Sequence, residues 1–170
     1  MDGSTVFYDP SGIGSYASGN PTTTTGADGS FDLTLPQNPA GQLVGYGGVI
    51  TATAQPNDAT FTALATAQVL SPLTTLVNNL IITQSLSEAD AISAIDAGLG
   101  RPTSYNLNAT CTMENALQGD PDAARAFAAE VKVYLLAHET AALLHGINSG
   151  KTVNSLMTMA FAQISSQIIS

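Results

Sequence analysis

The hydrophobic pattern of this chain changes its period near residue 70, and this change limits the possible folds more than any other feature. Before it, short β-branched and aromatic stretches are separated by turn residues such as Asp28-Gly29. After it, apolar residues recur at helical spacing between capping residues. The pattern predicts an α+β chain of 170 residues, with a β domain at 1–70 and a helical domain at 71–170.

Several short strands are expected in the first domain. They are predicted at residues 5–8, 22–25, 30–35, 43–46, 49–54 and 60–65. Phe31, Leu33 and Leu35 alternate with polar residues, so we expect them to face one core. Strands at this spacing are typical of a small antiparallel β-sandwich of the Ig-like or prealbumin-like kind.

Capping residues mark the helices of the second domain. Ser71 before Pro72 predicts the start of a first helix, and Ser85 with Glu88 forms a capping box for a second. Gly98, Gly100 and Pro102 mark the end of the second helix. Asp120-Pro121-Asp122 opens the longest helix, where the positive end of the helix explains the two acidic residues, and Gly146 ends it. The last helix is predicted at residues 153–169. The sequence predicts a bundle of four or five helices.

The charge balance and the lack of a long apolar run exclude two classes of partner. The chain has 13 acidic and 4 basic residues, a net charge of -9. A nucleic-acid-binding protein needs clustered Lys and Arg to neutralise phosphates, so we expect no nucleic-acid partner. No apolar run of about 18 residues occurs. We therefore expect no membrane insertion.

No catalytic residue set is evident. Cys111 is the single cysteine, so no intramolecular disulfide can form, and we interpret it as a small buried hydrophobe rather than a nucleophile. The chain contains no G-x-S-x-G nucleophile motif. The sequence predicts a protein that is not an enzyme.

Residues 146–152 resemble a phosphate-binding loop, but the spacing is wrong. The motif needs four residues between its glycines, and three lie between Gly146 and Gly150. It should also follow a buried strand, whereas this segment follows a predicted helix. We interpret it as a turn between two helices, with Lys151 in solvent.

His138 and His145 are the candidate cofactor ligands. Seven residues apart, they lie on one face of the longest predicted helix, about 10.5 Å apart along its axis, with Phe127, Val131 and Tyr134. Metal ligation from one helix favours a four-residue spacing. We interpret them as polar positions in a helix seam. The alternative is a carrier that holds haem or a metal ion in the helical half.

Four segments resemble a module of very large, repeat-containing, adhesin-like bacterial secreted proteins. In that module an A-T-V-F-x-D strand and a T-T-x-x-D-G-x-F-x-L stretch precede P-L-T-T-L-V and a helical L-S-E-A-x-A tail. The matching segments here are residues 5–9, 28–33, 72–77 and 86–91. The resemblance implies a carboxypeptidase-regulatory-like or SdrD-B-like sandwich with a helical tail.

The resemblance also implies a loop whose side-chain oxygens bind calcium. Asp9 is retained, and Asp28 is a second weak calcium candidate. Ser11, Ile13, Ala17 and Asn20 stand where the family has Asn, Asn, Asp and Glu. We expect no tight calcium site and, outside the carrier alternative, no metal or cofactor.

The family sandwich usually has sequence before its T-V-F strand. We therefore expect Thr5 to Tyr8 to form an open sheet edge, to which another protein chain can add a strand. Met1 to Ser4 lack the features of a signal peptide. We interpret the chain as a fragment of a longer precursor, extracellular or at the cell surface, acting in adhesion or assembly by binding other protein chains.

Overall fold

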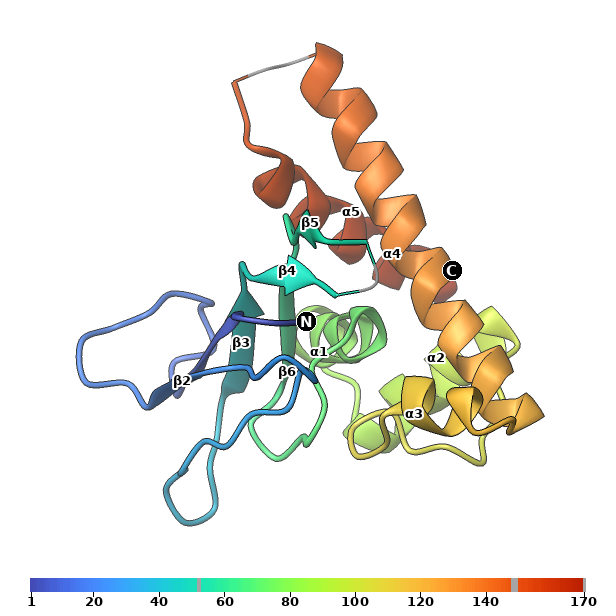
Figure 1. Cartoon of the computed structure of the whole chain (residues 1–170), viewed down its shortest axis with the longest axis horizontal. Helices are drawn as coiled ribbons and strands as arrows, with labels where there is room; N and C mark the ends of the chain where they lie inside the picture. The colour runs from blue at the N-terminus through green and yellow to red at the C-terminus, as the bar shows by residue number, and fades with distance from the viewer. Residues whose placement is uncertain (52, 148–149, 170) are drawn as a thin grey trace.

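The computed structural model describes residues 1–51, 53–147 and 150–169 (Figure 1). Strands precede helices, which confirms the predicted α+β class. The strands are β1 (Thr5–Asp9), β2 (Thr22–Thr24), β3 (Gln42–Tyr46), β4 (Val49–Ile50), β5 (Gln55–Pro56) and β6 (Thr60–Leu64). The helices are α1 (Pro72–Gln84), α2 (Glu88–Leu99), α3 (Thr112–Leu117), α4 (Pro121–Ile147) and α5 (Val153–Ile168).

The main sheet has four antiparallel strands in the order β2-β1-β3-β6. β1 lies inside it, because Val6 pairs with Thr23 on one side and with Gly45 on the other. The prediction that Thr5 to Tyr8 form an open edge is therefore wrong. β2 and β3 occupy the two hydrogen-bonding edges of β1, so a further strand has no place to pair there.

The β6 edge of this sheet is covered by the start of α1. Thr75 Oγ1 accepts a hydrogen bond from the Thr62 N–H at 3.0 Å, and Thr74 Oγ1 donates one to the Thr62 carbonyl at 3.1 Å. Asn154 of α5 donates another to Thr60 Oγ1. Side chains thus take the place of a neighbouring strand, which is one way to protect a sheet edge.

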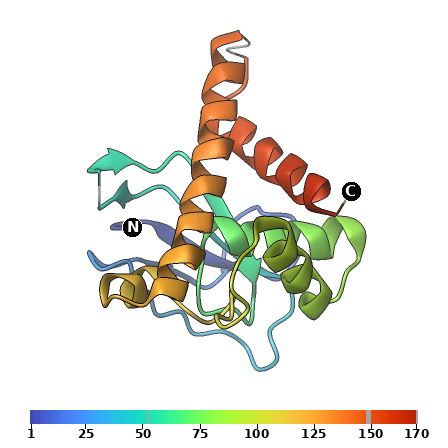
Figure 2. The ribbon, with the colours of Figure 1, turned by 90° about the vertical axis from the view of Figure 1, so that its right-hand side faces the viewer.

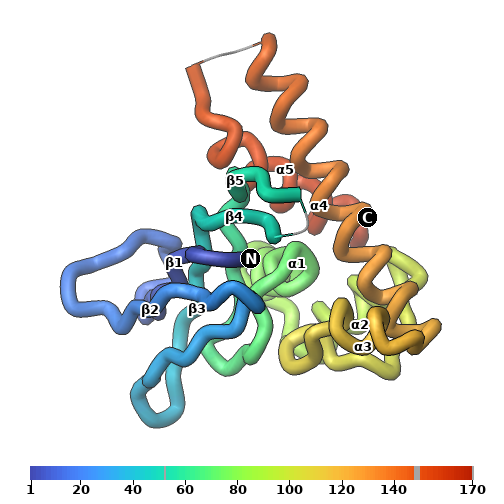
Figure 3. Tube along the Cα trace, in the orientation of Figure 1, coloured from blue at the N-terminus to red at the C-terminus, as the bar shows by residue number. Residues whose placement is uncertain are grey.

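Residues 30–35 alternate in burial as predicted but do not form a strand. Phe31, Leu33 and Leu35 are half-buried and pack against Tyr8 and Leu43. The second sheet in the described residues is the two-stranded β4–β5 ribbon. A sandwich needs two sheets packed face to face. The predicted sandwich is therefore not confirmed. Residues 30–35, a single segment that forms no strand, cover the sheet at Tyr8 and Leu43 instead (Figure 3).

The predicted first helix is confirmed with its cap. Ser71 Oγ accepts the Thr74 N–H, and Thr74 Oγ1 accepts the Ser71 N–H. The capping box predicted at Ser85 is wrong, since Ser85 ends α1 in the left-handed region. Ser87 begins α2 instead, and its side chain accepts the Asp90 N–H. Ser87 and Asp90 are three residues apart, as the predicted pair Ser85 and Glu88 are, but the cap lies two positions further along the chain.

The boundaries predicted for α2, α4 and α5 lie within a few residues of those in the structure, whereas no boundaries were predicted for α3. Asp120 Oδ1 accepts the N–H groups of Asp122 and Ala123 at the start of α4. Gly100 ends α2 with φ 60°. α4 continues to Ile147, so Gly146 lies in its last turn rather than ending it. In the described part of the chain, no helix has both the length and the apolar character needed to cross a membrane.

Sheet and helices share the larger of the two hydrophobic core clusters that the described residues form. Leu73, Leu76 and Leu80 lie on one side of α1 and are fully buried with Phe61 of β6. The rings of Phe61 and Phe161 have centroids 6.1 Å apart. Burial of each such side chain contributes about 1.5–3 kcal/mol to folding.

Candidate functional site

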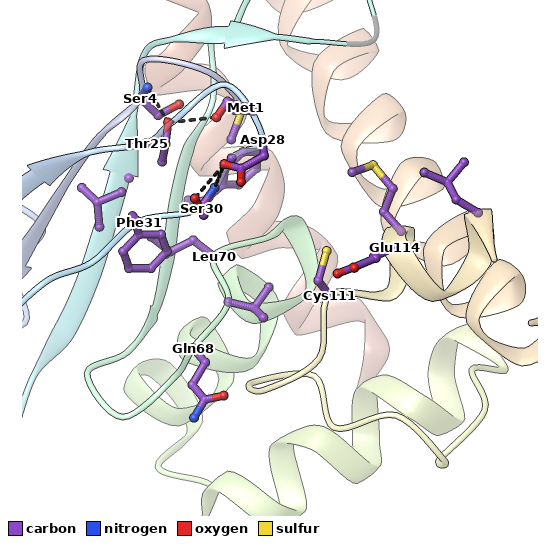
Figure 4. A pocket seen from close by; sticks show the side chains of 17 residues that line it. Met1, Ser4, Thr25, Asp28, Ser30, Phe31, Gln68, Leu70, Cys111 and Glu114 are labelled. Carbon is purple, nitrogen blue, oxygen red and sulfur yellow. Dashed lines mark hydrogen bonds between the residues drawn. The ribbon is translucent and has the colours of Figure 1, made fainter.

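A cleft of about 610 Å³ lies between the main sheet and α3 (Figure 4). One wall comes from the first 70 residues and the other from residues 111–117. The lining from the first wall is Met1, Ser4, Val6, Thr25, Asp28, Gly29, Ser30, Phe31, Gly45, Phe61, Gln68, Val69 and Leu70, and from the second Cys111, Met113, Glu114 and Leu117.

The sheet supplies an apolar floor for this cleft. Val6, Gly45 and Phe61 are register neighbours on three adjacent strands, so they share one face. Leu70 lies over that face beside Gly45. A Cβ atom at position 45 would lie 3.2 Å from Leu70 Cδ1, so glycine permits this close approach. The floor is thus part of the hydrogen-bonded sheet itself.

The opposite wall is apolar and unusually exposed. Leu117, at the end of α3, has 81% of its surface exposed, and Met113 has 41%. Cys111 is exposed just before the helix, so its prediction as a buried hydrophobe is wrong. The side chain is exposed because Cys111 directly precedes α3, a short helix that lies over the cleft rather than in the core. Its thiol faces the cleft beside Glu114 (Figure 4).

The charged side chains of the cleft are acidic. Asp28 lies on the sheet side and Glu114 on the helix side, and none of the described lining residues is basic. The Ser30 hydroxyl and N–H both donate to Asp28 Oδ1, which lowers the pKa of Asp28. The sheet side of the cleft therefore carries one acidic side chain, Asp28, close to the Met1 amino group, and the helix side carries Glu114.

Polar contacts hold residues 101–112, which lead into the α3 wall. The Gln68 N–H donates to the Asn108 carbonyl at 2.6 Å, and the Tyr105 hydroxyl donates to Asp120. That bond to Asp120, with burial and nearby acids, raises the pKa of Tyr105 to about 12. Thr112 donates to Glu130 of α4 at 3.2 Å. The wall is thus attached to both α4 and the segment before α1.

The two calcium candidates lie apart. Asp9 ends β1, whereas Asp28 follows the end of β2 that pairs with Thr5. The length of β1 separates those ends by about 13 Å. Both Asp9 oxygens accept hydrogen bonds from protein donors. Among the described residues, no group of three or more His, Cys, Asp or Glu side chains could hold a metal ion.

The two histidines do not converge either. The His138 ring stacks on Tyr134 with centroids 6.0 Å apart. Nδ1 of His145 lies 2.8 Å from the Lys151 carbonyl, at the turn between α4 and α5. Each ring has its own partner within the fold. The geometry gives no support to a shared haem or metal between them.

The segment that resembles a phosphate-binding loop connects two helices. α4 ends at Ile147, and Thr152 caps α5 by accepting the Ser155 N–H. No strand leads into it, since α4 does. Asn148 and Ser149 lie outside the described residues.

Sequence reasoning did not find the cleft. Its lining comes from positions far apart in the chain, which only the fold brings together. One local signal was available: Met113 and Leu117 are four residues apart, which places them on one side of a short helix. The three-dimensional arrangement can enclose an apolar group and attract a positive charge beside it.

No protein-family model, curated protein or solved structure matches this chain.

Proposed function

We propose that this protein is a non-enzymatic binding module that takes up an apolar segment of another protein chain in the cleft between the sheet and α3. The observation that favours this function is the exposed apolar wall, above all Leu117. An enclosed small-molecule site buries most of its ligand and of its own lining. Leu117 is covered only by a partner that extends beyond the cleft.

The acidic rims define the partner's chemistry. Asp28 and Glu114 lie on opposite sides of the apolar floor. A segment with one or two large apolar side chains flanked by Lys or Arg satisfies both walls. The net charge of -9 favours the approach of a basic segment over an acidic one.

The wider setting is also a proposal. The resemblance to adhesin-like modules supports a role at the cell surface or outside the cell, as part of a larger secreted protein. The cleft supplies a route to other protein chains that does not depend on adding a strand at β1.

The test uses a displayed library of short random peptides. It is selected on the immobilised protein and depleted on the Leu117→Glu variant. We expect selected peptides to combine large apolar residues with Lys or Arg. Their affinity, measured by fluorescence polarisation, should fall at least tenfold in Leu117→Glu and in Met113→Glu, because each change removes apolar contact surface and places a carboxylate against the peptide's apolar side chains.

Cys111 provides an independent readout, as the single cysteine lies in the cleft. Saturating peptide should slow its alkylation by iodoacetamide. Ile13→Glu is the matched control, because Ile13 is 75% exposed but outside the cleft lining. Peptides that bind Leu117→Glu as well as the wild type, or that leave Cys111 fully reactive, would show that the cleft is not the binding site.

A further inference from the structure

The C-terminal half of α4 exposes large apolar side chains. Leu136 is 56% exposed, Leu143 69% and Ile147 84%. These last turns of α4 project beyond the rest of the molecule, at the top of Figure 2. Single exposed apolar residues are common, but several on one projecting helix indicate a contact surface.

The spacing of these residues matches a coiled-coil seam. Leu136, Thr140, Leu143 and Ile147 are separated by four, three and four residues, as a and d positions are. Val133, Ala137 and Ala141 form the neighbouring stripe and are buried in the core. α4 therefore has two adjacent apolar stripes, and the seam is the exposed one.

A groove of about 340 Å³ begins at one end of the seam. Leu136 lines it together with Ile164 and Ile168 of α5 and Gly98 of α2. Its floor is apolar, and Gln163 and Gln167 complete its lining. The groove can receive one large aliphatic side chain presented by a second helix.

The distribution of charge favours a second copy of this chain as the occupant. Residues 131–169 contain Lys132, Lys151 and Glu139, a net charge of +1, whereas residues 1–130 contain 12 acids and 2 bases, a net charge of -10. α5 contains no charged residue. Two copies that meet through the acid-rich parts of residues 1–130 bring like charges together, and the α4–α5 region avoids that repulsion.

We propose that two copies associate through this seam, with their α4 helices antiparallel. In an antiparallel pair, a positions face d positions of the partner. Pairing Leu136 of one copy with Ile147 of the other also pairs Thr140 with Leu143, so one twofold axis satisfies the whole seam. Ile147 of each copy then fills the groove beside Leu136 of the other. The seam is about 17 Å long, so association is reversible and depends on concentration.

Sedimentation velocity of the full chain, from low micromolar to millimolar concentration, tests the proposal. We expect a shift from monomer to dimer, which Ile147→Glu and Leu143→Glu abolish. Ile13→Glu is the control, because it places the same charge on a comparably exposed apolar residue, 75% exposed, outside both the seam and the cleft. A monomer throughout, or a dimer that persists in Ile147→Glu, would overturn the proposal. Circular dichroism establishes that each variant is folded.

A charge-pair rescue tests the register. Ile147→Glu and Leu136→Lys should each be monomeric alone. Mixed together, they should form a heterodimer, since the new Glu and Lys face each other at one end and native residues meet at the other. Failure of the mixture to associate would overturn the antiparallel register. Binding of monomeric wild type to phosphatidylcholine vesicles, lost in Ile147→Glu, would instead assign the surface to lipid and overturn the dimer.

Discussion

Two buried polar clusters, one around Asp9 and one around Arg101, differ in how fully their hydrogen bonds are satisfied. Asp9 is 1% exposed, and its carboxylate accepts from the Ser11 N–H and hydroxyl, the Gly14 N–H and the Gln42 amide. Gln42 Oε1 in turn accepts from Asn78 of α1 at 2.6 Å. The chain of bonds runs unbroken from the loop after β1 to the first helix.

The Arg101 cluster is less complete. The Arg101 side chain is fully buried, with Nε 2.6 Å from Asp96 Oδ1 and Nη2 donating to the Tyr105 carbonyl at 2.7 Å. Within the described residues, Nη1 of Arg101 and Oδ1 of Asn108 are buried without a hydrogen-bond partner. Buried polar atoms are normally paired, so each unpaired one reduces stability.

This difference shows where the fold depends on a single interaction. The Asp9 cluster spreads one charge over four donors. The Arg101 cluster sits at the base of residues 101–112, which lead into the α3 wall of the cleft, and depends mainly on the pair with Asp96. Disturbing Arg101 should therefore affect both stability and the cleft, whereas disturbing Asp9 should affect stability alone.

Replacement of Arg101 gives the largest expected effect. Arg101→Met leaves Asp96, itself 6% exposed, without its counter-ion. Breaking a buried pair by removal of one partner costs about 3–5 kcal/mol. We expect the free energy of unfolding in urea to fall by about that amount, and the affinity of the cleft for its peptides to fall because residues 101–112 loosen.

Arg125→Met is the matched control for this change. Arg125 pairs with Asp122 at 3.1 Å, but its side chain is 72% exposed. Surface pairs of this kind contribute about 0–1 kcal/mol. If the two replacements cost the same, the Arg101 pair is not the main support of its cluster.

Acid should distinguish Asp9 from Glu130, the carboxylate of α4 near the second cluster. Burial favours a higher pKa at Asp9, but hydrogen bonds from Ser11, Gln42 and Gly14 outweigh it, and the pKa of Asp9 is lowered. Asp9 thus adds stability above its unfolded pKa, which is lost as the pH falls through its folded value.

Burial raises the pKa of Glu130, despite hydrogen bonds from Ser71 and Thr112 and the charge of Arg101. Its contribution to stability increases as the pH falls.

The two conservative variants should therefore act in opposite directions. Unfolding free energies measured between about pH 7 and pH 3 should fall less steeply in Asp9→Asn than in the wild type, and more steeply in Glu130→Gln. At neutral pH, Asp9→Asn should lower the free energy of unfolding by about 2 kcal/mol, because the new NH2 group replaces an acceptor oxygen and faces the donors of Ser11, Gly14 and Gln42. Asp32→Asn, at an exposed position, serves as the control. Slopes that change in the same direction for both variants would contradict this assignment.

The sequence predicted which segments form strands and helices better than it predicted which strands pair with one another. Thr5 to Tyr8 were correctly expected to form a strand, because β-branched and aromatic residues are a local property. That β1 lies between two strands depends on β2 and β3 closing on it from both sides. Residues 30–35 show the same limit: period-two spacing predicted which side chains are half-buried, but burial does not require a neighbouring strand.

Exposure of the candidate site could not be predicted for a related reason. Cys111 belongs to a residue type that is usually buried. Its exposure follows from the position of α3 over the sheet, which polar contacts of residues 101–112 determine. The cap of α4 at Asp120, by contrast, depends on three consecutive residues and was predicted correctly.

Calcium gives the smallest expected effect and tests whether the Asp9 cluster is complete as it stands. Calcium takes six to eight oxygen ligands, whereas Asp9 is surrounded by N–H and O–H donors from Ser11, Gly14 and Gln42. We expect the melting temperature to agree within about 1 °C in millimolar calcium and in chelator, since a ligand stabilises only a state that it binds. Magnesium at the same concentration controls for ionic strength. A rise of several degrees that Asp9→Asn removes would mean that these donors turn away to admit the ion. The cluster would then be a metal site closed by its own hydrogen bonds, and its contrast with the Arg101 cluster would no longer hold.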